Sequence, residues 1–375
     1  FGLPSCSDIL DQKPLDSYTD TAVWGDLSLA ESFLNYCYLR VEAENTNGVM
    51  FCNYTDETYH MHDYGTSTYT QGRASCDNYN TGWTEGKGNT WSHYYGGIKL
   101  CNQLLEDIMD TPANTDSEKE WKNQIIGQGY FLRAYYYHML YSVYGRIPLI
   151  DHTYDLDSEF KEERADMDDV ADFIVADCDK AAELLPTVYK DASDFGRATK
   201  GAALALKGRV LLYKASPLFG TPSREKWQAA ADANKAVIDM NIYSLKQVSN
   251  SDEYADLFFD SKNPEVIFEK LYDEKGIAGS SASLVMQAPA GPGNGYEGWS
   301  TWQPTYEIVE LFQNADGTPY KPAETKPFTI LQTTIDPDSG EATQKEVTIQ
   351  ASDVNPWEGR EIRLKANILD RKSVV

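Results

Sequence analysis

Apolar residues recur with a helical period of about 3.6 residues through most of the first 240 positions of this chain. The stretches that carry the pattern are 20–43, about 91–108, 117–144, 166–185, 199–215 and 223–240. The third stretch ends at Gly145 and is followed by Pro148, an order typical of a helix exit. Amphipathic helices bury their apolar faces by packing on one another. The sequence therefore predicts a mainly α architecture.

The stretch at 199–215 is rich in small residues, at Ala202, Ala203, Ala205 and Gly208. Their lack of bulk allows a neighbouring helix to approach closely. Together with 223–240, this stretch resembles a tetratricopeptide unit, although the fit to the usual period of about 34 residues is loose. Earlier pairs would carry insertions at 44–89 and 146–165. Stacked pairs of this type bury their cores between neighbours and leave one face free.

The pattern changes after residue 250. We expect a strand at 265–272, a loop at 276–304, a short helix at 306–312, and two strands at 328–334 and 346–350 joined by a turn at 336–340. The sequence thus predicts three parts: a tether at 1–18, a helical region at 19–250 with an inserted loop at 44–89, and a mixed region at 251–375.

Composition excludes several classes of function. The 33 basic and 58 acidic side chains give a formal net charge of -25, which repels nucleic-acid backbones. No apolar run approaches the roughly 20 residues that span a bilayer. The aromatic residues are 25 Tyr, 13 Phe and 8 Trp, so that Tyr dominates. Tyr and Trp stack on planar or sugar faces while keeping a polar group.

Catalytic motifs are absent or incomplete. Residues 82–88 (GWTEGKG) miss the spacing and the Ser or Thr of a phosphate loop, and 291–295 (GPGNG) lacks the strand–helix context of a dinucleotide site. Residues 59–63 (YHMHD) carry metal-binding groups, but isolated polar residues in a surface loop are the simpler interpretation. A glycosidase carboxylate pair stays open by number alone. We predict no enzyme, no metal site and no cofactor.

Residues 3–6 (LPSC) resemble a bacterial lipobox, in which Cys6 is acylated. Ser7, Asp8 and Asp11 resemble the acidic tag that exports lipoproteins to the cell surface in Bacteroidetes. The alternative is a cysteine without a role. Lipidation at Cys6 anchors a protein to a membrane without spanning it.

The other cysteines include no C-x-x-C pair, which argues against zinc-ribbon and thioredoxin sites. Cys37, Cys101 and Cys178 lie in helical patterns, and we expect buried thiols there. Outside the cytoplasm one or two disulfides can form, with a pairing that the sequence leaves open.

Several motifs together resemble the SusD/RagB family of outer-membrane lipoproteins. They are 6–14 (CSDILDQKP), 91–102 (WSHYYGGIKLCN), 131–150 (FLRAYYYHMLYSVYGRIPLI), 197–213 (RATKGAALALKGRVLLY) and 305–312 (TYEIVELF) with Asp316 and Gly317. They occur in family order over most of the chain. We interpret Arg133, Ala134, Gly145 and Ala202 as packing and capping residues, which indicate the fold and not the ligand.

The resemblance implies a SusD-like α/α superhelix with a loop-rich, partly β ligand-binding region. It implies a non-catalytic, lipid-anchored protein on the outer surface of the outer membrane. Such a protein captures oligosaccharides for a SusC-like TonB-dependent transporter. A peptide ligand, a purely structural scaffold role beside the transporter and a surface glycan hydrolase remain as alternatives. Family members continue well past the position of Val375, so the resemblance also implies a C-terminal truncation.

Two segments break the helical period and concentrate aromatic and polar residues, at 63–89 and 293–302. In the fold that the sequence resembles, the corresponding loops lie together on the ligand-binding face. The stacking candidates are Tyr79, Trp83, Tyr296, Trp299 and Trp302. The hydrogen-bonding candidates are Asp63, Arg73, Asp77 and Asn89. For each Trp, a buried loop anchor is the alternative.

Overall fold

The computed structural model describes residues 20–41, 55–60, 71–72, 90–155, 157–271, 302–322, 326–335, 342–351 and 357–368. The chain divides into two compact units. The helical unit comprises Phe1–Val49, Gln71–Lys246 and Lys262–Ser280, and the mixed unit comprises Met50–Thr70, Gln247–Ser261 and Ser281–Val375.

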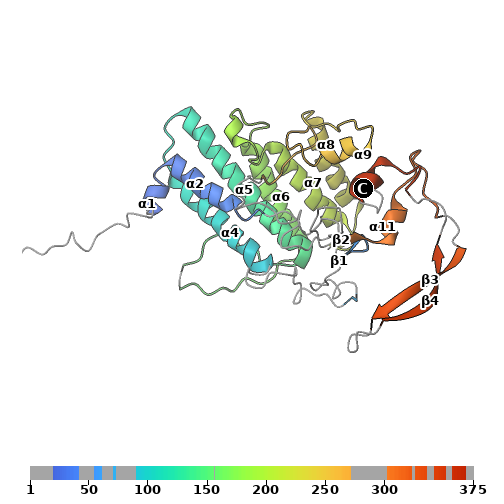
Figure 1. Ribbon diagram of the computed structural model, residues 1–375. Coiled ribbons are helices and arrows are strands. Elements are labelled where there is room, and N and C mark those ends of the chain that lie inside the picture. Colours follow the sequence, from blue (N-terminus) through green and yellow to red (C-terminus); the bar gives the residue numbers. More distant parts are fainter. Residues whose placement is uncertain are drawn as a thin grey trace, which may run out of the picture. The chain divides into compact units, whose positions relative to one another are not determined.

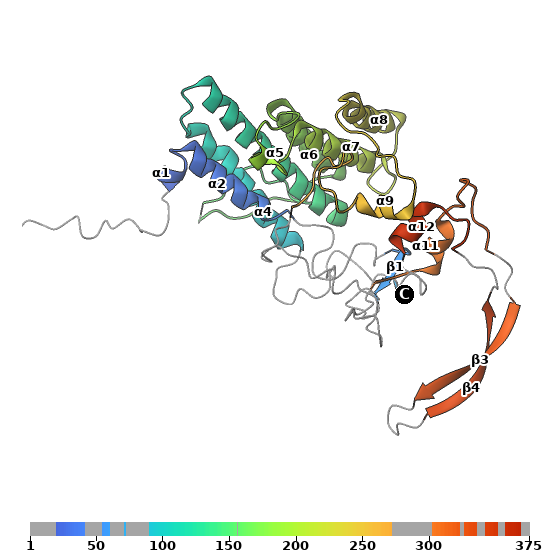
Figure 2. The same cartoon turned by 45° about the horizontal axis from the view of Figure 1, so that its top comes forward.

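The helical unit is a succession of packed helices, as the hydrophobic period predicts. They are α1 (Asp20–Val23), α2 (Leu27–Tyr38), α4 (Thr90–Asp107), α5 (Asp116–Tyr144), α6 (Met167–Leu184), α7 (Lys200–Ala215) and α8 (Arg224–Asp239), with short 3-10 turns at Ile108–Asp110 and Ala192–Asp194. From α4 to α8 each helix packs on the next along the chain, and α2 packs on both α4 and α5. Figures 1 and 2 show these helices side by side.

The single helix predicted at 20–43 is wrong in one respect, because the structure breaks it into α1 and α2. Asp26 causes the break: its backbone is extended, and its carboxylate accepts hydrogen bonds from the backbone N–H groups of Ser28, at 2.7 Å, and Leu29. An Asp in this position satisfies N–H groups that a new helix leaves without partners. The apolar period continues across the break, which is why the sequence pattern alone does not reveal it.

Helix α5 forms the centre of the helical unit. It begins at a capping box in which Thr115 and Glu118 bond each other's backbone N–H groups, at 2.8 and 3.2 Å. It ends at Gly145, whose φ of 65° suits glycine. Its largest fully buried side chains include Phe131, Tyr136, Tyr137 and Tyr141. This helix supplies the wide aromatic core between α4 and α6.

Arg133 links α5 to its neighbours through a buried ion pair. Its guanidinium donates two hydrogen bonds to the Asp177 carboxylate on α6, at 2.7 and 2.9 Å, and one to Asn102 Oδ1 on α4 at 2.9 Å. Asn102 in turn donates to the carbonyl oxygens of Ile150 and His152. The prediction that Arg133 is a packing residue is confirmed, since the network ties three helices and the connection after α5.

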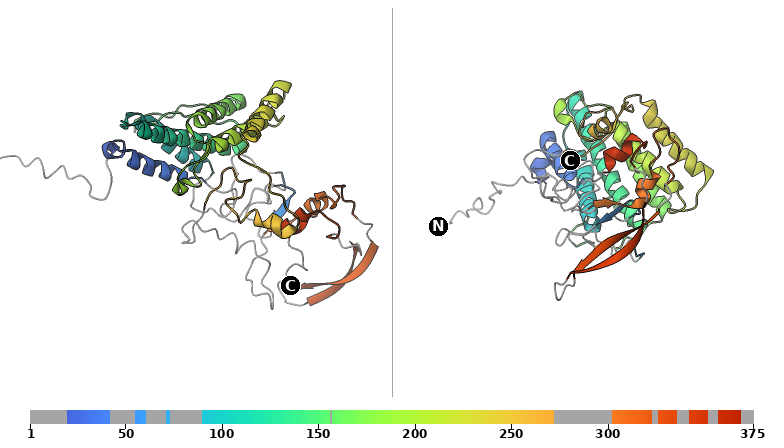
Figure 3. Two further views of the ribbon diagram at one scale, coloured as in Figure 1. Left: turned by 90° about the horizontal axis from the view of Figure 1, so that it is seen from above. Right: turned by 45° about the vertical axis from the view of Figure 1, so that its right-hand side comes forward.

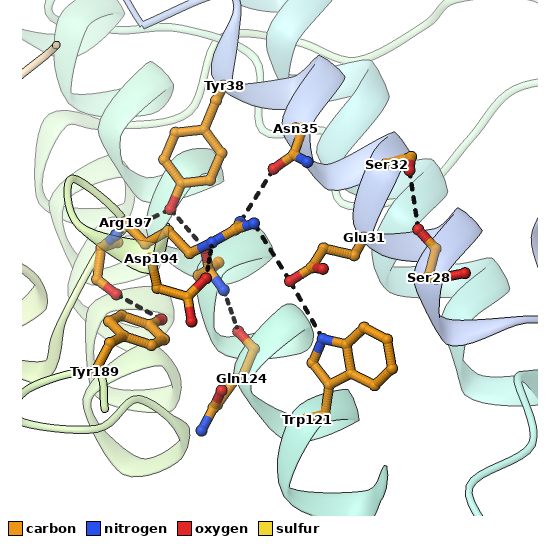
Figure 4. Close-up of polar contacts among 12 residues, drawn as sticks. Ser28, Glu31, Ser32, Asn35, Tyr38, Trp121, Gln124, Tyr189, Asp194 and Arg197 are labelled. Atoms are coloured by element: carbon orange, nitrogen blue, oxygen red, sulfur yellow. Dashed lines mark hydrogen bonds and ion pairs between the residues drawn. The ribbon is translucent and has the colours of Figure 1, made fainter. Parts of the chain in front are cut away.

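A second polar cluster joins α2, α5 and the connection that leads into α7 (Figure 4). Arg197 pairs with Asp194 at 2.8 Å and with Glu31 of α2 at 3.3 Å, and donates to Asn35 Oδ1 at 3.0 Å. Trp121 of α5 donates to the Glu31 carboxylate at 3.2 Å. Because these groups satisfy one another, we interpret this Arg197 cluster as a structural clamp.

The small residues of α7 allow the close approach that the sequence predicts. A Cβ placed at Gly208 would lie 2.7 Å from the Asn234 side chain of α8. Ala202 and Ala203 are buried, as are Cys37, Cys101 and Cys178, whose thiols are free. The α7–α8 pair and its neighbours thus form tetratricopeptide-like stacked pairs.

The strand predicted at 265–272 is wrong for the residues that the structure describes there. Residues 262–271 form turns and irregular chain, and Tyr272 lies outside the described residues. Phe268 packs its ring against Phe131 of α5, with 5.0 Å between ring centroids. Phe268 therefore packs on a helix and not on a neighbouring strand.

The mixed unit contains β1 (Thr58–His60), α9 (Ser251–Asp256), β2 (Trp302–Pro304), α11 (Tyr306–Leu311), β3 (Lys326–Ile335), β4 (Ala342–Ala351) and α12 (Ile362–Asn367). Helices α9 and α12 pack on each other. Strands β3 and β4 form an antiparallel pair with Ile330 opposite Val347, visible as a long curved ribbon in Figure 3. The predicted short helix and both predicted strands are confirmed, while the turn at 336–340 lies outside the described residues.

Candidate functional site

A two-stranded antiparallel sheet in the mixed unit joins parts of the chain that are far apart in sequence. β1 pairs with β2 so that Thr58 lies opposite Pro304 and His60 lies opposite Trp302. The pairing continues beyond the strands, because Thr305 N donates to the Glu57 carbonyl oxygen at 2.9 Å. The chain that leaves β1 after His60 and the chain that enters β2 at Trp302 therefore meet at one end of this sheet.

This pairing bears on the predicted ligand-binding segments, 63–89 and 293–302. The first begins shortly after His60 and the second ends at Trp302, so both connect to the same end of the β1–β2 sheet. The predicted residues Asp63, Arg73, Asp77, Tyr79, Trp83, Asn89, Tyr296 and Trp299 lie outside the described residues, as does Cys6. Trp302 is described in its backbone alone. Their roles in binding stay predictions.

A pocket of about 310 Å³ opens next to the other end of the same sheet, where β2 runs into α11. Its lining residues are Pro304, Thr305, Tyr306, Val309, Glu310, Tyr320, Trp357 and Ile368. Pro304 belongs both to β2 and to the pocket wall. Two residues of strand span roughly 7 Å. The pocket wall at Pro304 therefore lies roughly 7 Å along the strand from Trp302, where the second predicted segment ends.

Thr305 positions the helical wall of the pocket. Its hydroxyl accepts a hydrogen bond from Ile308 N at 3.2 Å, which caps the start of α11. The same hydroxyl donates to the backbone carbonyl oxygen of Asp56. One side chain thus attaches the short helix α11 to the segment before β1, and a six-residue helix needs such support because isolated short helices are unstable.

Tyr306 and Glu310 lie one turn apart on α11 and face the pocket together. Loss of water around the Tyr306 hydroxyl and the nearby Glu310 carboxylate both raise the pKa of this phenol. A hydrogen bond between the Tyr306 hydroxyl and the Glu310 side chain raises this pKa further, so the two residues contact each other in the pocket wall. Glu310 takes part in none of the ion pairs within the described part of the chain.

Arg360 supports the pocket from behind. Its guanidinium carbon lies 3.6 Å from the centroid of the Tyr320 ring, a cation–π distance. The same guanidinium donates to the carbonyl oxygens of Val309 and Phe312, both at 2.6 Å, and so satisfies acceptors at the end of α11. Arg360 is 5% exposed and holds Tyr320 and α11 in place without lining the pocket.

Sequence reasoning missed Tyr306, Glu310, Tyr320 and Trp357 as candidate binding residues. The spacing of Tyr306 and Glu310 was a usable signal, since it places both on one helix face. Tyr320 and Trp357 join them through tertiary structure, and no local pattern links them to α11.

Two further properties concern the described part of the chain alone. It contains no group of three or more His, Cys, Asp or Glu side chains that could hold a metal ion. Of the metal-binding candidates at 59–63, Tyr59 and His60 lie in β1, and the others lie outside the described residues. Among the described helices, none has both the length and the apolar character needed to cross a membrane.

Comparison with protein families gives two matches that follow each other along the chain. A family model described as "Starch-binding associating with outer membrane" matches residues 8–212, and the SusD family model matches residues 264–375. The chain belongs to the SusD family. Members of this family bind carbohydrate and reside at the surface of the outer membrane.

Two curated SusD-like proteins of Formosa agariphila are similar over part of their length. One is 26% identical over 232 residues, which cover 57% of this chain and 41% of the relative. The other is 25% identical over 226 residues, which cover 58% of this chain and 38% of the relative. The chain thus spans less than half the length of these relatives.

Solved structures share the fold. A SusD-like protein from Bacteroides fragilis superposes with a TM-score of 0.72 at 24% identity, covering 95% of this chain and 63% of that one. A SusD-like carbohydrate binding protein from the same organism gives 0.64 at 23% identity, covering 80% and 55%. A surface glycan-binding protein from Bacteroides uniformis gives 0.61 at 19% identity, covering 84% and 66%. The SusD-like fold predicted from the sequence motifs is confirmed.

Proposed function

We propose that this protein captures oligosaccharides at the cell surface without cleaving them and delivers them to a SusC-like TonB-dependent transporter. The observation that carries the proposal is the aromatic pocket beside the β1–β2 sheet, with Tyr306, Tyr320 and Trp357 in its wall. Aromatic rings cover the apolar faces of sugar rings, and neighbouring polar groups satisfy the hydroxyls. Carbohydrate binding by other SusD family members supports this assignment.

The two segments that connect at the far end of the sheet extend the proposed binding surface. In the proposal, Tyr79, Trp83, Tyr296, Trp299 and Trp302 stack on further sugar rings. Asp63, Arg73, Asp77 and Asn89 bond hydroxyl groups. The pairing of His60 with Trp302 supports this arrangement, because it joins the strand that precedes the first segment to the residue at which the second segment ends.

The first test is an affinity screen of the protein against oligosaccharides and peptides, followed by substitutions in the pocket. We expect Trp357→Ala to weaken glycan binding by about 1–3 kcal/mol, the range for loss of a stacking aromatic. Trp227→Ala is the matched control, because Trp227 lies on α8 in the helical unit and is 45% exposed. Melting temperatures of both variants separate a lost contact from a lost fold.

Each alternative function predicts a different result of this screen. Binding of peptides with no glycan bound would favour the peptide-binding alternative. Association with the transporter without any ligand would favour a scaffold. Release of new reducing ends from a bound oligosaccharide by pure protein would favour a hydrolase. Unchanged glycan affinity in Trp357→Ala would remove the pocket from the proposed site.

A further inference from the structure

The pocket of the mixed unit combines aromatic rings with a carboxylate, and this combination is more selective than an aromatic surface alone. Three of its lining residues are aromatic, one is Glu310, and none is Lys, Arg or His. Its volume of about 310 Å³ lies at the small end of ligand sites, which run from roughly 300 to 1,000 Å³. A site of this size accepts one small portion of a ligand.

Glu310 contributes a negative charge that the described part of the chain does not pair with a cation. The guanidinium of Arg360, behind the same helix, donates to the carbonyl oxygens of Val309 and Phe312 and lies against the Tyr320 ring. The pocket therefore presents a carboxylate to its ligand, and a cationic group satisfies it best.

Aromatic rings add to this preference for a cation. An ammonium group near the faces of Trp or Tyr rings is attracted by their quadrupoles, and cages of such rings recognise organic ammonium ions. Tyr306 and Trp357 line the same pocket as Glu310. The formal net charge of -25 adds a field that favours cationic ligands and repels uronic acids and sulfated sugars.

We propose that this pocket binds a protonated amino sugar, whose ammonium group pairs with Glu310 while its apolar ring face lies against Tyr306 and Trp357. The inference rests on the proposed function, because it names the class of glycan that the same site selects. A neutral sugar satisfies the rings but leaves the carboxylate without a cation. A peptide ammonium satisfies the carboxylate without offering a sugar face.

The test uses calorimetric titration of the whole protein with ligands that differ in one group. Glucosamine oligosaccharides carry the free amine, N-acetylglucosamine oligosaccharides of equal length carry the amide, and a lysine-containing peptide carries an amine without a sugar. We expect the free-amine oligosaccharide to bind about fivefold or more tightly than the amide, given the strength of a partly desolvated cation–π and ionic contact. This comparison is made on the unaltered protein and depends on no variant.

Substitutions on α11 then assign the preference to one carboxylate. Glu310→Gln keeps the shape of the side chain and should abolish the preference for the amine. Glu307→Gln is the matched control, because Glu307 lies on the same helix, is exposed and does not line the pocket. The control should retain the full preference.

The outcomes separate this inference from the proposed function. Equal or tighter binding of the amide would overturn the amino-sugar assignment and leave glycan capture standing. A preference for the amine that survives in Glu310→Gln would overturn the role of this pocket. Binding of the lysine peptide alone would overturn the sugar class. Absence of binding to every glycan would overturn the proposed function itself.

Discussion

At the scale of single residues, burial decides what a polar side chain can do in this protein. Arg133 is 5% exposed, yet each of its three guanidinium nitrogens donates a hydrogen bond, to Asp177 or to Asn102. His138 is 4% exposed, and its Nδ1 has no hydrogen-bond partner among the residues that the structure describes. The two residues lie on the same helix, but only Arg133 has hydrogen-bond partners for its buried polar atoms among the described residues.

The first prediction concerns the pH dependence that His138 causes. Burial, with a further contribution from Arg209, lowers the pKa of His138 from 6.5 to about 4. Between these values the unfolded chain binds a proton at this residue and the folded chain does not, so stability falls as the pH falls through this window. A pKa shift of this size corresponds to about 3 kcal/mol of folding stability. The protein has lost this whole amount once the pH has fallen to about 4.

Substitution with an uncharged ring should remove this contribution. We expect His138→Phe to lose less stability than the parent between pH 7 and pH 4, as measured by urea unfolding at several pH values. An unchanged acid dependence in His138→Phe would contradict the assignment.

At the scale of secondary-structure elements, the distance between helices depends on certain glycines. Side chains from neighbouring elements fill the space that a Cβ atom would take at these positions. Gly96 and Gly97 are consecutive in α4 but face different surroundings. A Cβ at Gly97 would lie 2.7 Å from the Tyr136 ring, which is fully buried and whose hydroxyl bonds the Cys37 carbonyl oxygen at 2.6 Å. A Cβ at Gly96 would lie 2.9 Å from the end of the Arg40 side chain, which can move.

The second prediction follows from this difference. Gly97→Ala should destabilise the protein by about 1–3 kcal/mol, because the Tyr136 ring cannot retreat within the core. Gly96→Ala should be close to neutral, since helix propensity favours Ala by about 1 kcal/mol and offsets the displacement of Arg40. Urea unfolding of both variants measures the effect. Equal destabilisation by the two substitutions would mean that Tyr136 does not limit the α4–α5 distance.

At the scale of the whole molecule, the structure describes two units with different architectures, and the division of the chain into a tether, a helical region and a mixed region stays a prediction. The helical unit carries the stacked pairs that define the fold. The mixed unit carries the pocket and the β1–β2 sheet. The pocket therefore lies among the short helices and strands of the mixed unit.

The third prediction concerns the anchor that we propose at Cys6. When the chain is expressed behind a lipoprotein signal in a host that exports such proteins, Cys6→Ala should move the protein from the outer-membrane fraction to the soluble fraction. Ser5→Ala is the control, because it keeps a small residue before the cysteine. Fractionation in a strain without the partner transporter makes the test strict. Retention of Cys6→Ala in that membrane fraction would contradict lipid anchoring.

Local patterns were sufficient for most of the helices. The predicted bounds at 117–144, 166–185, 199–215 and 223–240 differ from α5, α6, α7 and α8 by no more than one residue at either end. These helices can be predicted without the tertiary structure, because each signal involves residues that are close together in the sequence. The signals are the helical period, the capping residues and Gly145. Strands β3 and β4 were also predicted from local alternation, and the predicted bounds at 328–334 and 346–350 fall inside them.

The sequence by itself determined the helical architecture and, through its motifs, the family, because periodicity, caps and family motifs are properties of contiguous residues. Only the tertiary structure decided how 262–271 folds, which strands pair, and where the pocket lies. His60 pairs with Trp302, and Tyr306 lines the same pocket as Trp357. Both arrangements join residues that are distant along the chain. Such contacts depend on how packed elements fit together, and no local period encodes that fit.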